Sequence, residues 1–295
     1  MKLKKNVPAS ERLYKAFIYV VLALLAIIIL VPVAWAFMAS VKETSEHYAN
    51  PWNLPTHIHW QNFVDAWNKA NMSGYMFNSV FVTGLALVIL LVVALPASYC
   101  LARFKFTGRK LINTCFMAGL FVNVNYIVVP IYLMLSDADK FLKTTIGQAF
   151  LLNNHIVVAV IYAATALPFT IYLLTGYFAT LPHDFEEAAY MDGAGYGKTM
   201  MKIMFPMAKP AIITVILFNF LSFWNEYIII KTMIPMKTGW TLPAGVLNLM
   251  QAQQAAAEYG PMYAGLVMVM IPVLVLYIMV QKNLTKGMTV GGLKG

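Results

Sequence analysis

The chain has 295 residues, of which 60% are hydrophobic and only 11% are charged. Soluble domains usually contain about 25% charged residues, so this composition excludes an ordinary soluble fold and requires lipid around much of the surface. The formal net charge is +9, but the basic residues lie in short clusters between apolar runs. That arrangement favours a role in membrane topology over nucleic-acid binding.

Six apolar runs are long enough to cross a bilayer as helices, which takes about 20 residues each. They lie near residues 16–40, 76–102, 111–135, 155–178, 210–230 and 263–281. The runs are continuous and do not alternate with polar residues, so they predict helices and not a β-barrel. We find no internal repeat and no soluble segment. The sequence therefore predicts a single all-α membrane domain over residues 1–295.

Most of the 21 basic residues precede the first run, follow the sixth, or lie between runs two and three and between runs four and five. Basic residues beside spans stay in the cytoplasm, so both termini are expected there in a multi-pass protein. The segment 42–75 then lies outside, and its residues Trp52, Trp60 and Trp67 suit contact with lipid headgroups. His57 and His59 lack a carboxylate or cysteine partner, and no metal site is expected.

The cytoplasmic segment 181–206, between runs four and five, is the most informative part of the sequence. Asp184 and Glu187 have the spacing of a capping box, which predicts a helix start. Gly193 permits a tight turn after this helix, and a second helix is expected to run toward Ile203 and stop before Pro206. A short, structured and exposed loop of this kind is suited to docking in a groove of a partner protein.

This loop resembles the coupling loop of the permeases of ATP-driven (ABC) importers. That family carries Glu-Ala-Ala, three residues, Gly, nine residues, then Ile-x-Leu-Pro. This chain has Glu187-Ala188-Ala189, Gly193 and Ile203-Met204-Phe205-Pro206, with Phe205 replacing Leu as the single departure. The resemblance implies a bacterial inner-membrane protein whose loop passes motion from a separate ATPase. The implied coupling residues are Glu187, Ala188, Ala189, Asp192, Gly193, Ile203 and Pro206.

Two further segments resemble carbohydrate-uptake permeases of the maltose-permease type. They are Phe223-Trp224-Asn225-Glu226-Tyr227 and the C-terminal stretch from Gly287 to Gly295. The resemblance implies that the tail, residues 282–295, inserts between two ATPase subunits, with Gly291, Gly292 and Lys294 in contact. The alternative is a basic tail beside the membrane without a partner.

A substrate path is expected near Trp224, Asn225 and Glu226. Glu226 is the one acidic residue within the predicted spans, and a charge at membrane depth should face a cavity or a partner. Trp224 offers an aromatic face to a sugar ring, and Asn225 offers a donor and an acceptor. The alternative places this segment at the outer interface, where Glu226 reaches water. Asn123, Asn125 and Asn219 either line the same path or bond between helices.

The sequence contains no phosphate-binding loop and no recognisable catalytic motif. We therefore expect no enzyme activity and no bound cofactor, with ATP and Mg²⁺ on the partner ATPase. The resemblance implies an assembly with a second, related permease, two ATPase subunits and an external substrate-binding protein, and transport of a sugar or oligosaccharide by alternating access. The alternatives are an ion-gradient-driven transporter, which usually carries several intramembrane charges, and a polytopic membrane enzyme.

Overall fold

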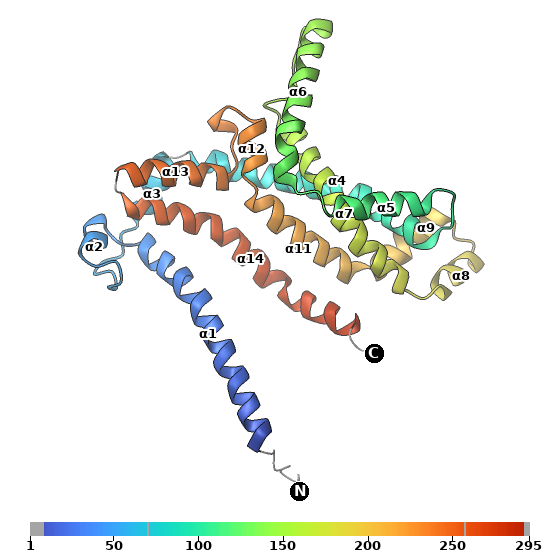
Figure 1. The fold of residues 1–295 in the computed structure, drawn as a ribbon, viewed down its shortest axis with the longest axis horizontal. Helices are drawn as coiled ribbons and strands as arrows, with labels where there is room; N and C mark the ends of the chain where they lie inside the picture. The colour runs from blue at the N-terminus through green and yellow to red at the C-terminus, as the bar shows by residue number, and fades with distance from the viewer. Residues whose placement is uncertain (1–8, 70, 257, 292–295) are drawn as a thin grey trace. The chain divides into compact units, whose positions relative to one another are not determined.

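The computed structural model describes residues 9–69, 71–256 and 258–291, and within these ranges the secondary structure is entirely helical (Figure 1). Four helices are long and apolar enough to cross a membrane: Leu13–Ser40, Met72–Arg103, His155–Thr180 and Tyr259–Gln281. Two bent helix pairs bring the number to six if each pair is one span. The all-α membrane fold predicted from the apolar runs is confirmed.

The described residues form two compact units, one from 9–69 with 249–256 and 258–268, and one from 71–248 with 269–291. The first unit contains α1 (Ala9–Ser40), α2 (Thr44–Ala49) and α3 (Gln61–Lys69). It also includes the end of α13 (Leu242–Ala256) and the beginning of α14 (Tyr259–Gly291). The sequence had suggested one domain, and this division was not visible in its composition.

Buried polar groups hold together the turn that follows α1. The Lys42 side chain is fully buried, and its Nζ donates to the carbonyl oxygens of Asn50 at 3.2 Å and Pro51 at 3.0 Å. The Asn62 amide donates to the carbonyl oxygens of Ser40 at 3.0 Å and Lys42 at 2.7 Å. Buried polar groups are costly unless they are hydrogen-bonded, so these bonds fix one path for the backbone.

The second unit is built around α4 (Met72–Arg103) and α7 (His155–Thr180), which pack along each other. Small residues of α4, including Ala86, Ala94 and Ser98, are fully buried and allow the two helices to approach closely. α11 (Lys209–Asn225) packs against α7 as well. The Asn219 amide joins these two helices by donating to Thr170 Oγ1 at 3.0 Å.

Two of the predicted spans are interrupted. The run near 111–135 consists of α5 (Arg109–Gly119) and α6 (Val124–Ile146), which meet at 104°. Asn123 begins α6, because its side chain accepts a hydrogen bond from the backbone N–H of Asn125 at 3.0 Å. The run near 210–230 ends as a helix at Asn225 and resumes as α12 (Ile228–Met233). A 3₁₀ turn follows at Lys237–Gly239.

Candidate functional site

The loop between α7 and α11 begins with α8 (Asp184–Met191). The predicted capping box is wrong. Asp184 is the first residue of the helix, the N-cap position belongs to His183, and no side chain caps the helix there. Asp184, Glu186 and Glu187 all lie in the first turn, where negative charge is favoured by the helix dipole. The helix start therefore depends on charge and on side-chain contacts made elsewhere.

Gly193 ends α8 as expected. Its φ of +74° is in the left-handed region, where a glycine has no Cβ to clash with the backbone. The N–H of Gly193 donates to the carbonyl of Tyr190 at 3.0 Å, and that of Ala194 donates to Ala189 at 2.9 Å. This pair of bonds is a Schellman motif, with Asp192 as the C-cap residue.

The second helix of the loop does not stop before Pro206, as the sequence had suggested. α9 (Tyr196–Thr199) continues as a π-helix (Met200–Met204) and then as α10 (Phe205–Met207). The N–H of Phe205 reaches back five residues to the carbonyl of Met200, which widens the turn. Pro206 then stands in the first turn of α10, where its missing N–H is not needed. The segment Tyr196–Met207 meets α11 at 74°.

The predicted coupling residues differ in exposure. Five of them lie on the surface or are exposed at the turn: Glu187, Ala188, Asp192, Gly193 and Pro206. Ile203 is half-buried. Ala189 differs from the expectation that it forms part of the contact surface, because it is only 4% exposed and faces the protein. Adjacent residues of a helix point about 100° apart, so Ala188 and Ala189 cannot both face a partner.

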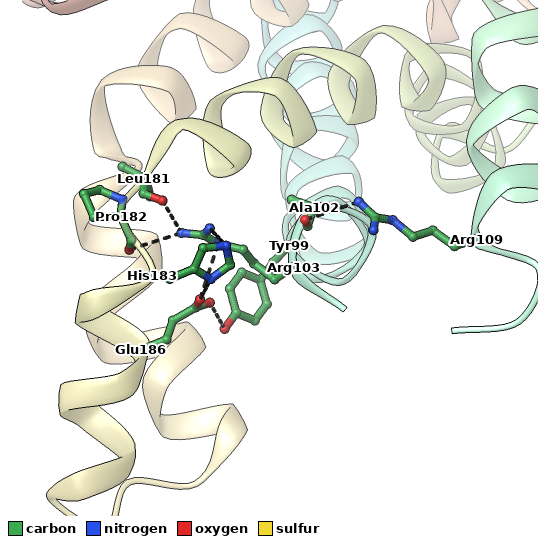
Figure 2. A network of polar contacts seen from close by, with 8 residues as sticks. All are labelled: Tyr99, Ala102, Arg103, Arg109, Leu181, Pro182, His183 and Glu186. Carbon is green, nitrogen blue, oxygen red and sulfur yellow. Dashed lines mark hydrogen bonds and ion pairs between the residues drawn. The ribbon is translucent and has the colours of Figure 1, made fainter. Parts of the chain in front are cut away.

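A buried residue that the sequence analysis did not single out anchors this loop. Glu186 is 6% exposed, and its Oε1 accepts a hydrogen bond from the Tyr99 hydroxyl at 2.7 Å. Its Oε2 lies 3.5 Å from Arg103 Nε and 3.2 Å from His183 Nδ1. Figure 2 shows the three partners converging on this carboxylate from α4 and from the start of α8. One buried acid thus connects α8 to the end of α4.

Arg103 joins three segments at this point. Its Nη2 donates to the carbonyl oxygens of Leu181 at 2.6 Å and Pro182 at 3.4 Å, directly after the end of α7 (Figure 2). A cation at a helix C-terminus is favoured by the helix dipole and satisfies carbonyls that have no partner within the helix. Arg109 does the same for α4, since its Nε donates to Leu101 O at 2.8 Å.

Tyr190, near the end of α8, is partly exposed but lies close to Glu186 and Tyr196. Burial raises the pKa of its phenol above the usual value, and the negative charge of Glu186 adds to the effect. The Tyr190 ring meets Tyr196 edge-on, with 5.3 Å between ring centres. Two further edge-on contacts continue from Tyr196 through Phe104 to Tyr99. Aromatic packing therefore supports the polar contacts around Glu186.

The Glu186 cluster could in part have been found from the sequence. Adjacent residues of a helix point about 100° apart. When one face of α8 packs on the protein, Glu186 and Glu187 are therefore expected to differ in burial. Arg103, at the end of the second predicted span, lies on the same side of the membrane as the loop. What the sequence did not reveal is that the two meet.

A second candidate region is a cavity of about 440 Å³ between α6, α7, α11 and α12. Polar groups on its wall include Asn125, Thr165, Ser222 and Glu226, and aromatic rings include Phe169 and Phe218. A concave site with aromatic surfaces and a few polar groups is typical of small-molecule binding.

Glu226 has a structural role beside this cavity. Its carboxylate accepts hydrogen bonds from the backbone N–H groups of Ile228 at 2.8 Å and Ile229 at 2.9 Å, at the start of α12. The Tyr162 hydroxyl donates to its Oε2 at 2.8 Å. This half-buried carboxylate is therefore stabilised by donors within the chain, at the break between α11 and α12.

Trp224 and Asn225 do not line the cavity, although both were expected on the path. Trp224 is 2% exposed, and its Nε1 donates to the carbonyl of Val269 at 3.3 Å. Its ring stacks on Phe220 with 5.3 Å between centres. Asn225 is exposed, and its amide donates back to Leu221 O at 2.8 Å within its own helix. Trp224 is thus a packing residue, because its large apolar ring is buried between helices.

The three asparagines have different roles, and that of Asn123 was not among those expected. Asn125 and Asn219 contribute to the cavity wall, and Asn219 also makes the bond between α7 and α11 described above. Asn123 caps α6. In the tail, the backbone of α14 is helical as far as Gly291, while Gly292 and Lys294 lie outside the described residues.

Comparison with known proteins identifies the family. Residues 91–290 match the model of the binding-protein-dependent transport system inner membrane component. The chain belongs to this family. It is 34% identical over 290 residues to the diacetylchitobiose uptake system permease protein NgcG of Streptomyces coelicolor, covering 98% of this chain and 92% of that one. The permease protein DasC of the same organism, also from a diacetylchitobiose uptake system, is 29% identical, covering 90% and 91%.

A solved structure shares the fold. A bacterial ABC transporter involved in the import of the acidic polysaccharide alginate superposes with a TM-score of 0.76 at 23% identity, covering 94% of this chain and 98% of that one. The family predicted from the Glu187–Pro206 motif is confirmed, and the chain is a multi-pass transport permease of the inner membrane, not an enzyme. The alternative of an ion-gradient-driven transporter finds no support in these comparisons.

Proposed function

We propose that this permease forms half of the translocation path of an ATP-driven sugar importer and alternates between inward-open and outward-open states. The observation that carries the proposal is the structured loop of α8 to α10. It presents Glu187 and Ala188 on the surface, while Glu186 and Ala189 of the same short helix are buried. An exposed helix that is also attached to the rest of the protein is suited to contact an ATPase and to transmit the movement of the ATPase to the membrane helices.

We infer an assembly of this chain with a second, related permease, two ATPase subunits and an external substrate-binding protein. The family description, which names a binding-protein-dependent system, supports the last of these partners. In this assembly α8 docks on an ATPase, ATP binding closes the ATPase pair, and the loop moves inward. The C-terminal tail, residues 282–295, with Gly291, Gly292 and Lys294, lies between the ATPases, which bind ATP and Mg²⁺. The distribution of basic residues supports cytoplasmic termini.

Purification of a tagged chain from its own host in mild detergent, followed by mass spectrometry, tests this assembly. We expect recovery of a second permease and of a protein with a phosphate-binding loop. A double substitution of Glu187 and Gly193 should reduce the recovery of the ATPase. A chain that purifies alone, stable and monomeric, contradicts the proposal.

For the substrate we propose a small neutral oligosaccharide, with N,N′-diacetylchitobiose as the first candidate. Two relatives that cover most of this chain belong to uptake systems for that disaccharide. The cavity supports the proposal, because the amide of Asn125 and the hydroxyls of Thr165 and Ser222 can bond sugar hydroxyls, and the Phe169 ring can cover a sugar face. Uptake of labelled N,N′-diacetylchitobiose by cells with and without the chain tests this, with trehalose as the comparison sugar. Equal uptake of the disaccharide by both strains excludes it.

A further inference from the structure

We propose that Glu186, Arg103 and Tyr99 form a buried joint that makes the coupling helix α8 and the cytoplasmic end of α4 move as one body, so that the loop drives the second span directly. This inference rests on the proposed function, and it assigns to these three residues the positioning of the loop during transport. The motif from Glu187 to Pro206 contains none of the three.

The first argument is connectivity. In the sequence α8 is attached to α7, and it leads through α9 and α10 to α11. The end of α4 is separated from Glu186 by more than eighty residues. Without the contacts of Glu186, a push on α8 would reach α4 only indirectly, through the packing of α7, the bonds of Arg103 to Leu181 and Pro182, and the aromatic contacts of Tyr196. Figure 2 shows instead that side chains from α4 reach α8 itself.

The second argument is burial. The side chains of Arg103 and Glu186 are 3% and 8% exposed, and Tyr99 is 1% exposed. A buried charged pair that separates regains little hydration, so its opening is costly even though Arg103 keeps its bonds to Leu181 and Pro182. By contrast, the pair formed by Lys140 and Asp137 is 74% exposed on both sides, although its atoms are closer at 2.8 Å. Such a surface pair opens at little cost.

The third argument is geometry. Glu186 accepts the Tyr99 hydroxyl on one oxygen and faces Arg103 with the other. Arg103 in turn uses Nη2 to hold the carbonyls of Leu181 and Pro182. The contacts come from opposite sides of the carboxylate and from both α4 residues, which lie one turn apart. An attachment at two points resists rotation as well as separation, which is what a joint that transmits motion requires.

The fourth argument is that two adjacent glutamates of α8 have different surroundings. Glu187 is exposed and free to meet a partner, whereas Glu186 is committed to α4. The short helix α8 thus has an outer face for the ATPase and an inner face attached to the second span. We infer that α4, the end of α7 and α8 form the rigid element of the transport cycle, and that the movement occurs beyond it, at the bend between α10 and α11.

The test measures whether α4 and α8 keep a fixed distance during the ATP cycle. Spin labels are placed at Lys105, just after α4, and at Met191, at the end of α8, both of which are exposed. The native Cys100 and Cys115 are first replaced by serine. The distance distribution is measured by double electron–electron resonance in the purified complex, without nucleotide and with a non-hydrolysable ATP analogue. We expect a narrow distribution that does not change on adding the nucleotide.

In the Glu186→Gln variant we expect a distribution at least twice as wide, with a mean that shifts when the nucleotide is added. Tyr99→Phe keeps the charge pair and should give a smaller effect, and it serves as the second variant if Glu186→Gln does not assemble. The control is Asp137→Asn, which removes the exposed pair and should leave the distribution unchanged. This readout separates a joint from a residue needed only for folding, because it is recorded on assembled complex.

The inference is overturned if the unmodified complex changes its label distance on adding nucleotide, or if both variants keep the narrow distribution. Neither result affects the proposed function, since the ATPase is still bound. If no ATPase purifies with the unmodified chain, both the inference and the proposed function are wrong. The two failures are therefore distinguished by one purification and one distance measurement.

Discussion

Trp224 illustrates how a residue chosen for its chemistry can have a structural task. An indole beside an acidic residue in a span suggested a surface for a sugar, yet the ring is buried and its N–H donates to Val269 O. Replacing Trp224 by Phe removes this donor and leaves a gap where the larger indole packed, although the Val269 carbonyl stays within the hydrogen-bond ladder of α14. We expect a loss of about 2 kcal/mol in the free energy of unfolding, measured by thermal unfolding in detergent.

The control for this substitution is Trp60→Phe, because Trp60 is 64% exposed and its replacement should leave the melting temperature nearly unchanged. Sugar uptake at a temperature where both variants are folded should equal that of the parent. If Trp224→Phe reduced the apparent sugar affinity without lowering stability, the residue would belong to the path after all.

The stability of the protein is expected to depend more on the carboxylate oxygens of Glu226, which accept hydrogen bonds, than on the negative charge of that side chain. Glu226→Gln keeps one oxygen that can accept from Ile228 or Ile229, whereas Glu226→Ala leaves these N–H groups and the Tyr162 hydroxyl without their acceptor. We expect Glu226→Ala to cost about 2–4 kcal/mol of stability and Glu226→Gln clearly less. Melting temperatures of the two variants decide this, and equal losses would show that the charge itself matters.

His47 should make the first unit sensitive to acid. Its Nε2 lies 3.1 Å from the Ala39 carbonyl oxygen, its ring stacks on Tyr263, and Lys42 and Glu46 are the nearest charged groups. Burial lowers the pKa of His47 below its usual value of 6.5. The unfolded chain therefore binds the proton first as the pH falls, so stability is full above pH 6.5 and declines below it.

This pH effect is measured as the change in melting temperature between pH 8 and pH 5.5. The melting temperature of the parent chain should fall more than that of the His47→Gln variant, because glutamine cannot be protonated in this pH range. His57→Gln is the matched control, because His57 is exposed. Its melting temperature should fall by as much as that of the parent. If His47→Gln and the parent lose equally, the acid sensitivity originates elsewhere.

At the scale of elements, the turn after α8 depends on its backbone conformation. Gly193 has a φ of +74° with open space around the position of a Cβ, so the cost of Gly193→Ala comes from the backbone alone. We expect a loss of about 1–2 kcal/mol and weaker retention of the ATPase on purification. Gly195 is the matched control: it also has open space, but its φ of −74° suits any residue. Gly195→Ala should behave as the parent, and equal effects would contradict the argument.

The breaks in the helices were the hardest elements to predict. Pro206 suggested a helix end, because proline has no backbone N–H and disfavours a helical residue before it, but the helix continues through the π-helical turn from Met200 to Met204 to Pro206. The interruption at Glu226 was hidden within an apolar run, since hydropathy records composition and not hydrogen bonding. By contrast, the turn at Gly193 was predictable, because few residues other than glycine adopt a positive φ.

At the scale of the whole molecule, composition and charge sufficed for the fold class, and the resemblance of the motif from Glu187 to Pro206 led to the family. The same patterns did not reveal contacts between distant segments. Glu186 and Arg103 lie far apart in the sequence and meet only because α4 packs along α7. Of the residues expected on the path, Glu226 lines the cavity and Trp224 does not, since neighbouring residues of one helix face different surroundings; the path itself stays a prediction.

The predicted orientation can be measured in intact cells. Single cysteines are introduced at Met191, in the loop expected inside, and at Trp52, in the segment expected outside, after replacement of Cys100 and Cys115. Both positions are exposed, at 89% and 68%. A maleimide that does not cross membranes should label the Trp52→Cys chain in whole cells and the Met191→Cys chain only after the cells are opened. The reverse pattern would place the termini outside.

The contacts of Arg103 also have a consequence for biosynthesis. Leu181, whose carbonyl accepts from the guanidinium, follows Arg103 by 78 residues. At a synthesis rate of about 5–20 residues per second, roughly 4–16 s pass between the synthesis of Arg103 and that of Leu181. During that time the guanidinium remains a hydrated cation beside a newly inserted helix, and in the predicted orientation it would help to retain that end in the cytoplasm. The same side chain is therefore expected first to orient the nascent chain in the membrane. After folding, it connects α4 to Leu181 and Glu186.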